Sequence, residues 1–227
     1  SPVPDDDGLW LIDLETGKSR LLLSIAEVIR SSVVPEVQAG PAWFNHVLYN
    51  TDGTRLFFLV RALKPEGGWF TSLWTADADG SHPHCEIEFG YTISHFDWRD
   101  PETILISTDA ADGTMGFCLL RPGGKPEPFL RDLLPRDGHA SFSPDRRWLL
   151  SDSDARGPEN ARELMLVNLE ETRKISLGEF ASPEHIKGDI RCDLHPRWRP
   201  DGQAVSFDTV HEGSRQIYIA DVADLTG

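Results

Sequence analysis

The sequence of 227 residues contains few cysteines and no long apolar run. Its three cysteines, Cys85, Cys118 and Cys192, lie far apart without CxxC spacing, which argues against a disulfide framework and against a zinc knuckle. No apolar stretch is long enough to span a bilayer. The opening SPVPDDDG also lacks the basic start and the apolar stretch of a signal peptide. Disulfide-rich and membrane-spanning classes are therefore disfavoured.

Basic residues are scarce as well. The chain has 22 Lys and Arg against 37 Asp and Glu, which gives a net charge of −15. Such a field repels nucleic acid and anionic membranes, so we expect neither as a partner. It also opposes an anionic substrate, which would need a local cationic site. Hydrophobic residues make up 39% of the sequence and charged residues 26%, which predicts a packed core rather than disorder.

A segment led by histidine occurs four times. The four histidines are His46, His95, His139 and His195. In each segment an aromatic residue follows three positions later, then a turn with Asp and Gly or Pro, then a short apolar strand. The spacing of the segments is close to that of four-stranded propeller blades, about 40–50 residues. The repeat therefore predicts an all-β fold of the β-propeller type.

The repeats divide the sequence into blades of one β-propeller domain over residues 1–227. The expected pieces are a half blade at 8–24 and four successive blades at 43–90, 91–131, 137–180 and 190–224. The first piece has only two strands and the last unit stops after its third. This favours the C-terminal part of a larger propeller, whose N-terminal blades are missing. The alternative is a small closed ring, in which the N-terminal strands complete the last blade. That blade lacks one strand, whereas the N-terminal piece supplies two, so the ring is the less favoured arrangement.

One segment, residues 25–40, breaks the repeat. Its apolar residues Ile25, Val28 and Ile29 are helically spaced, and Pro35 is expected to end the helix. The segment predicts a short helix or a long loop before the His46 blade.

Several segments resemble known propeller families. SPDG-type turns and the ending IYIADV resemble the PD40 repeats of TolB-like propellers, and DGHASFSPDRRWLLSD and DIRCDLHPRW resemble bacterial proteins related to oligogalacturonate lyase. The resemblance covers the chain from about Gly8 onward. It implies a seven-bladed propeller with a divalent metal, usually manganese with zinc as the alternative, held by histidines near the central channel. It also implies β-elimination on short uronate oligosaccharides and a cytoplasmic location.

The histidine column is the candidate metal site. In a propeller the first strand of each blade lines the central channel, so equivalent histidines would form an arc around the axis. Neutral imidazoles bind divalent metals at about 2.0–2.2 Å, and we expect His46, His139 and His195 to be ligands. Asp193 points to the same side of its strand as His195, so it is expected to be a further ligand or to orient one.

The other site residues follow from the chemistry of elimination. The reaction needs a base for a weakly acidic proton and a group that neutralises a carboxylate. His95 is the predicted base, from its alignment with the family, and Arg191 is the predicted carboxylate-binding residue, because a guanidinium can bind a carboxylate with two hydrogen bonds. His211 and Arg215 resemble the family's HEG-RQ segment and are predicted to bind the substrate, an acidic oligosaccharide.

Two alternatives stay open at this point. In WD40 propellers a histidine belongs to a structural hydrogen-bond tetrad, but here Gly-His precedes only one strand and no third strand ends in Trp-Asp. The alternative function is a non-catalytic TolB-like propeller that binds a protein or a glycan. A serine-peptidase propeller is poorly supported because the sequence has no GxSxG motif. Convergence of three imidazoles would favour the metal enzyme.

Overall fold

The structure, a computed structural model, describes residues 2–32, 34–157, 159–183 and 185–227. The chain forms two compact units, which are described separately. Unit 1 comprises Ser1–Ile93, Asp100–Thr103 and Arg121–Lys125, and unit 2 comprises Ser94–Arg99, Ile104–Leu120 and Pro126–Gly227. Within the described residues, no helix is both long and apolar enough to cross a membrane.

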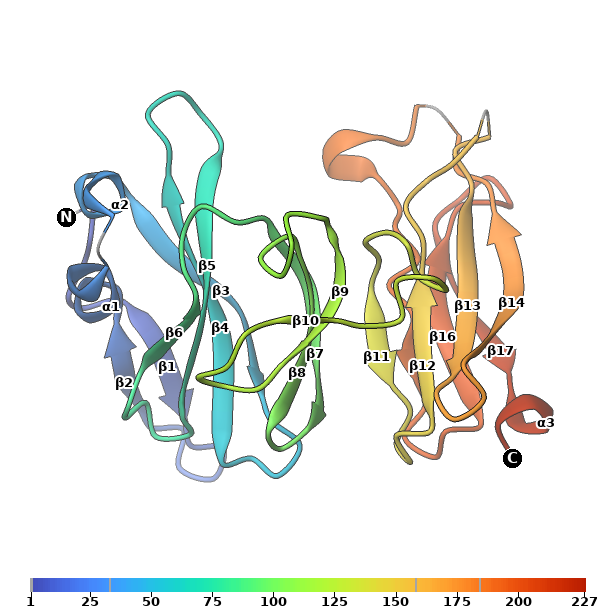
Figure 1. The fold of residues 1–227 in the computed structure, drawn as a ribbon, viewed down its shortest axis with the longest axis horizontal. Helices are drawn as coiled ribbons and strands as arrows, with labels where there is room; N and C mark the ends of the chain where they lie inside the picture. The colour runs from blue at the N-terminus through green and yellow to red at the C-terminus, as the bar shows by residue number, and fades with distance from the viewer. Residues whose placement is uncertain (1, 33, 158, 184) are drawn as a thin grey trace. The chain divides into compact units, whose positions relative to one another are not determined.

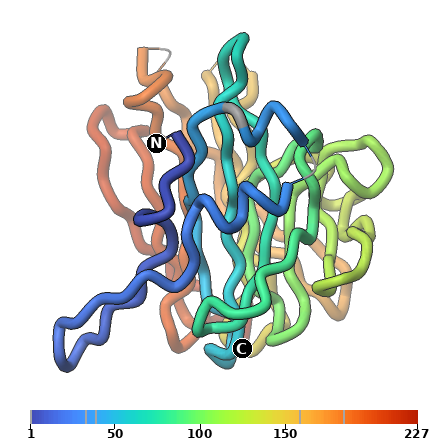
Figure 2. Tube along the Cα trace, turned by 90° about the vertical axis from the view of Figure 1, so that its left-hand side faces the viewer, coloured from blue at the N-terminus to red at the C-terminus, as the bar shows by residue number. Residues whose placement is uncertain are grey.

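Unit 1 contains a hairpin, two short helices and a four-stranded antiparallel sheet (Figure 1). The hairpin pairs β1 (Gly8–Ile12) with β2 (Ser19–Ser24) and reaches away from the helices in Figure 2. The strands of the sheet, in spatial order, are β3 (Ala42–Tyr49), β4 (Arg55–Leu63), β5 (Trp69–Asp77) and β6 (His84–Ile87). Consecutive strands are neighbours, as short turns between antiparallel strands require.

The segment that breaks the repeat forms two helices, α1 (Ile25–Ser31) and α2 (Pro35–Ala39). Ser24 and Glu27 form a capping box at the start of α1, in which the Ser24 hydroxyl accepts the Glu27 N–H and the Glu27 carboxylate accepts the Ser24 N–H. The prediction that Pro35 ends the helix was wrong. Pro35 begins the second helix, because the first position of a helix does not use its N–H.

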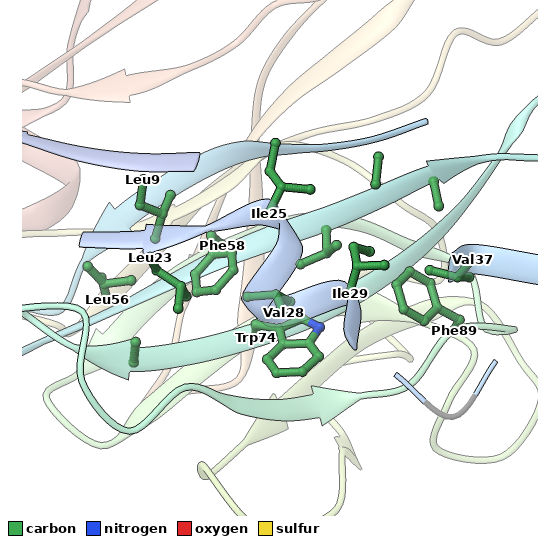
Figure 3. Close-up of a cluster of buried hydrophobic side chains, with 14 residues drawn as sticks. Leu9, Leu23, Ile25, Val28, Ile29, Val37, Leu56, Phe58, Trp74 and Phe89 are labelled. Atoms are coloured by element: carbon green, nitrogen blue, oxygen red, sulfur yellow. The ribbon is translucent and has the colours of Figure 1, made fainter. Parts of the chain in front are cut away.

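The apolar face of α1 explains why this segment is helical. Ile25, Val28 and Ile29 are buried together with residues of both the hairpin and the sheet (Figure 3). Leu23 of β2 and Phe58 of β4 belong to the same cluster. Helical spacing brings the three side chains onto one face, and their burial stabilises the helix more than its short length alone would allow.

Unit 2 contains three further antiparallel sheets (Figure 1). The first consists of β7 (Ile93–Asp100), β8 (Thr103–Thr108), β9 (Gly116–Leu120) and β10 (Glu127–Pro128), with the ends of β7 and β8 that meet at their turn belonging to unit 1. The second consists of β11 (Ala140–Phe142), β12 (Trp148–Asp152), β13 (Arg162–Asn168) and β14 (Arg173–Phe180). The third consists of β15 (Arg197–Trp198), β16 (Ala204–Thr209) and β17 (Gln216–Asp221). A 3₁₀ turn (Gly188–Ile190) and α3 (Ala223–Thr226) complete the unit.

Hydrogen bonds tie the first strands of neighbouring sheets in unit 2 to one another. The Asp97 carboxylate in β7 accepts the N–H of Phe142 in β11 at 3.1 Å, and burial raises the pKa of this carboxyl against the lowering effect of that bond. The Trp198 indole in β15 donates to the Ser141 carbonyl of β11 at 3.1 Å. These bonds fix the mutual positions of the first strands, and with them the histidines that lie in or before those strands.

The all-β prediction is confirmed by this architecture, with four-stranded sheets in three of the predicted blades and a three-stranded last sheet among the described residues. Of the aromatic residues that follow the four histidines, Trp98 and Phe142 are buried in unit 2, Trp198 is half-buried there, and Tyr49 in unit 1 is exposed. The prediction that residues 1–227 form one propeller domain, as part of a larger propeller, stays a prediction.

Candidate metal and acid–base site

Three of the four repeated histidines lie side by side in unit 2. His95 is in β7, His139 directly precedes β11, and His195 precedes β15. The ring centroids of His95 and His139 are 4.0 Å apart, and those of His139 and His195 are also 4.0 Å apart. Three successive sheets therefore place their imidazoles in one row.

Asp152, the last residue of β12, holds His139. Its carboxylate is buried, accepts the His139 backbone N–H at 2.6 Å and lies 2.9 Å from Nδ1 of the ring. A carboxylate on Nδ1 orients the ring and leaves the lone pair of Nε2 available to bind a metal ion. The preceding Gly138 is required for this approach, because a Cβ at that position would lie 2.1 Å from the Asp152 carbonyl oxygen.

Asp137 holds His95 in the same way. Its Oδ1 lies 3.0 Å from Nδ1 of His95, and the Ser94 hydroxyl lies 3.1 Å from the same nitrogen. Burial alone would lower the pKa of His95, but the hydrogen bond and the charge of Asp137 outweigh it and raise that pKa. In return, His95 holds the pKa of Asp137 at about 2 although burial works in the opposite direction.

His139, Asp193 and His195 form the candidate metal centre. One ligand atom from each lies within 4.8 Å of the others. Burial and the neighbouring His139 lower the pKa of His195, which favours the neutral imidazole that metals bind. Two imidazoles and a carboxylate are donors that manganese and zinc both accept, so the donor set fits a divalent metal ion.

Two arginines hold the carboxylate of Asp193. Arg162 Nη2 lies 2.8 Å from Oδ1, and Arg191 Nε lies 2.7 Å from Oδ2. Burial would raise the pKa of Asp193, but the hydrogen bond from Arg191 and the charge of Arg162 lower it. The carboxylate is therefore ionised at neutral pH and fixed in orientation, with lone pairs left for a further partner.

These groups line a cavity of about 190 Å³, which His95, His139, Arg162, Arg191 and Asp193 all border. The predicted carboxylate-binding residue, Arg191, is thus at the cavity, but its Nε is engaged with Asp193 and its side chain is 61% exposed. Arg162, which sequence analysis did not select, has a side chain only 11% exposed. The cavity therefore has one outer and one inner guanidinium.

The two predicted substrate-binding residues lie in the loop between β16 and β17. Nδ1 of His211 is 3.2 Å from the Thr209 hydroxyl, and the ring centroid lies 4.8 Å from that of Tyr218. Arg215 is paired with Asp208 at 3.1 Å. Neither His211 nor Arg215 is among the described residues that border the cavity of about 190 Å³, and their roles stay predictions.

His46 belongs to unit 1, where it lies at a bulge of β3 between Asn45 and Leu48. Its φ is 55°, and His195 has a φ of 41°. Both histidines thus have the left-handed backbone that few non-glycine residues adopt. This shared conformation agrees with their shared place in the repeat, while the role of His46 as a ligand stays a prediction.

Sequence analysis missed three residues that position the site: Asp137, Asp152 and Arg162. In the sequence, Asp137 comes two positions before His139, just as Asp193 comes two positions before His195. The repeat therefore contained a signal for Asp137. Asp152 and Asp208 also share one column of the repeat, near the end of the second strand of each blade. Arg162 gave no such signal, because β13 brings it to Asp193 of the following repeat.

No protein-family model matches the chain, and no curated protein matches it either. Among solved structures, it is similar to an oligogalacturonate lyase from Vibrio parahaemolyticus, with a TM-score of 0.64 and 19% identity over 93% of this chain and 53% of that one. It is also similar to TolB from Acinetobacter baumannii, with a TM-score of 0.52 and 17% identity over 81% of this chain and 56% of that one. Tricorn protease gives a TM-score of 0.60 at 16% identity, over 96% of this chain and 20% of that one.

These likenesses confirm the predicted β-propeller fold, and they agree with the resemblance noted in the repeats. The chain spans about half the length of the lyase and of the TolB protein, 53% and 56% respectively.

Proposed function

We propose that the protein is a metal-dependent β-propeller lyase that cleaves an acidic, uronate-type oligosaccharide by β-elimination. The observation that carries the proposal is the donor set of His139, Asp193 and His195, with ligand atoms within 4.8 Å of one another, beside the His95–Asp137 pair. The structural likeness to a protein described as an oligogalacturonate lyase supports the substrate class.

The proposed metal ligands and the residues that hold them have separate roles. His139, His195 and Asp193 would hold the divalent ion, manganese or zinc, and His46 is the further ligand expected from the repeat. When bound, the ion stabilises negative charge that develops on the substrate carboxylate. Asp152 keeps His139 in the tautomer that presents Nε2. Arg162 and Arg191 keep Asp193 ionised and in place.

His95 serves as the base. In its neutral form it takes the proton from the carbon beside the substrate carboxylate, and Asp137 on Nδ1 stabilises the imidazolium that results. The electron pair left on that carbon forms a C=C bond as the adjacent C–O bond to the leaving sugar breaks, and solvent water protonates the departing oxygen. Arg191 is exposed, and its terminal nitrogens would bind a substrate carboxylate while its Nε stays on Asp193. His211 and Arg215 are proposed to contact a more distant part of the oligosaccharide.

Two measurements test the proposal. Titration calorimetry with manganese is expected to give one site per chain, and His139→Ala/His195→Ala is expected to abolish it. His82→Ala is the matched control, because His82 is an exposed histidine paired only with Asp77. Oligogalacturonates added to the metal-loaded protein are then expected to yield the ultraviolet absorbance of an unsaturated uronate product. Failure of the wild-type protein to bind manganese would refute the proposed metal centre.

A non-catalytic TolB-like propeller is the second candidate, and the similarity to TolB over 81% of this chain favours it. In that case the metal-loaded protein binds a protein or a glycan and releases no unsaturated product. The cytoplasmic location, which the resemblance to the lyase family implies, stays a prediction that belongs to the lyase proposal.

A further inference from the structure

A pocket of about 230 Å³ lies within unit 1, where the β1–β2 hairpin meets β3 and β4. Residues of these four strands border it, and all of them belong to unit 1. Leu9 and Leu56, which are part of the buried cluster in Figure 3, contribute to its wall. The pocket shares no residue with the cavity of about 190 Å³ in unit 2, so it is a separate feature of the fold.

A bulge in the β1–β2 pairing borders this pocket. Leu9 pairs with Leu23, and the next residue, Trp10, pairs with Leu21. Leu22 is therefore an extra residue in β2, and it borders the pocket together with Leu9 and Trp10. A β-bulge changes the direction of side chains locally and is common beside functional sites.

A second bulge, in β3, borders the same pocket. The pairing of β3 with β4 shifts register between Asn45 and Leu48, so β3 has one extra residue there. Phe44 and Tyr49 are five positions apart and would point to opposite faces of a regular strand. Both border the pocket, because the extra residue brings them to the same face. Val47, within the bulge, also borders it, so two irregularities of the sheets converge on one pocket.

The pocket is open to solvent and uncharged. Trp10, Val47 and Tyr49 are 50%, 53% and 43% exposed, whereas Leu9 and Leu56 are buried. Exposed apolar side chains that gather in one place are typical of binding sites. None of the described residues that border the pocket carries a charge at neutral pH, although the net charge of the chain is −15. The pocket therefore suits an uncharged, largely apolar ligand rather than an acidic sugar.

Asn45 supplies an amide to this apolar pocket. Its Oδ1 is buried and has no hydrogen-bond partner among the described residues. An unsatisfied buried acceptor destabilises the protein, and a hydrogen bond from a ligand would remove that cost. Because Asn45 borders the pocket, rotation of its amide brings the oxygen to a molecule bound there. We therefore expect the ligand to carry an N–H or O–H group.

We propose that this pocket binds a small uncharged ring molecule with a single hydrogen-bond donor, which Asn45 Oδ1 accepts. The ring packs against the exposed side chains of Trp10 and Tyr49. An apolar cavity of about 150 Å³ holds benzene, so a pocket of about 230 Å³ accommodates up to two fused rings. This binding function is independent of the proposed lyase activity, because the two sites share no residue.

Indole and benzofuran are the probes, because they have nearly the same shape and only indole has an N–H donor. In calorimetric titrations of the full chain, we expect indole to bind about 3- to 10-fold more tightly than benzofuran, the contribution of one neutral hydrogen bond. Asn45→Leu is expected to lower the affinity for indole to that for benzofuran. Its affinity for benzofuran should stay within about twofold of wild type, because no hydrogen bond is lost. NMR shift changes at the Trp10 Nε1–H and at the amides of residues 44–49 locate the site.

Val47→Asp is a second variant, at an exposed position where substitution leaves the buried core intact. Its carboxylate at the mouth of an apolar pocket should weaken the binding of both probes about tenfold or more, because an apolar ring would desolvate the charge. The matched control is Leu63→Asp, a similarly exposed apolar residue of β4 that does not border the pocket. Leu63→Asp should bind both probes like wild type. If Asn45→Leu is unfolded by circular dichroism, the two probes on wild type and these two variants decide.

Several results would overturn the proposal. They are the absence of saturable binding of either probe, equal affinities of the two probes for wild type, and equal effects of Val47→Asp and Leu63→Asp. Displacement of indole by galacturonate would show that the pocket takes an acidic sugar instead. Among the described residues β1 pairs only with β2, so slow hydrogen exchange of its other amides in the free protein would show that a further strand already covers the pocket.

Discussion

His95 and His195 belong to one row of imidazoles, yet their surroundings shift their pKa values in opposite directions. At His95, the hydrogen bond and charge of Asp137 outweigh burial, so the pKa rises. At His195, burial and the adjacent His139 act together, so the pKa falls. A pair of titratable groups with diverging pKa values is typical of a site with one acid–base group and one ligand.

This divergence can be measured in the metal-free protein. Histidine NMR titrations are expected to give a pKa above the ordinary value of about 6.5 for His95 and below it for His195. Asp137→Asn is expected to lower the pKa of His95, because the acceptor charge is removed and burial then dominates. Equal pKa values for the two histidines, or no response of His95 to the substitution, would contradict the assignment of Asp137 as its partner.

The same pair implies a window of pH for stability. The raised pKa of His95 contributes stability that is complete below about pH 6.5 and is lost as pH rises through the folded pKa. The pKa of Asp137, about 2, contributes stability that is present above the unfolded value and is lost as pH falls through about 2. The pair therefore stabilises the protein most between the unfolded pKa of the carboxyl and that of the imidazole.

Arg162 is the inner of the two guanidiniums on Asp193, and its role can be separated from that of Arg191. Arg162→Ala is expected to weaken manganese binding by about 10- to 100-fold, because a buried carboxylate ligand loses its orienting partner. Arg173→Ala is the control, since Arg173 is an exposed arginine paired with Glu171 of the turn that precedes β14. Calorimetric titration with manganese measures both. An unchanged affinity in Arg162→Ala would show that Asp193 is held without it.

At the scale of elements, Gly138 joins the loop before β11 to the end of β12. Gly138→Ala is expected to destabilise the protein by about 2 kcal/mol or more, because the new Cβ meets the Asp152 carbonyl rather than a movable side chain. Gly116→Ala is the control, since its Cβ would meet only the flexible Arg131 side chain, at 3.2 Å. Urea unfolding gives both values. Equal losses would mean that the approach of residues 138 and 152 is not tight.

The elements themselves were largely predictable from the sequence. Short apolar runs between Asp-Gly and Pro-Asp turns define the strands of each blade. These turns are predictable because the turn residues themselves determine the local backbone conformation. The end of the first helix was not predictable, since Pro35 is compatible both with ending one helix and with beginning another. Arg162 was not predictable either, because its contact with Asp193 depends on how two sheets meet.

At the scale of the whole molecule, the repeat contains a fourth histidine, His46, which is predicted to be a metal ligand. His46 lies in unit 1, whereas His95, His139 and His195 lie in unit 2. The repeat predicts that His46 is a metal ligand, and its left-handed backbone matches that of His195.

Hydrogen–deuterium exchange with and without manganese tests the predicted ligand role of His46. Metal binding stabilises the folded state by an amount that grows with the logarithm of the ion concentration over the dissociation constant, about 2.7 kcal/mol when that ratio is 100. Slower exchange is expected in residues 137–140 and 191–195 in any case, and also in β3 if His46 binds the ion. His46→Ala should then weaken manganese binding and remove the protection of β3 alone. Slower exchange in unit 2 without slower exchange in β3, together with an unchanged manganese affinity of His46→Ala, would restrict the metal centre to His139, Asp193 and His195. A residue that contributes no binding energy leaves the exchange of its own strand unchanged.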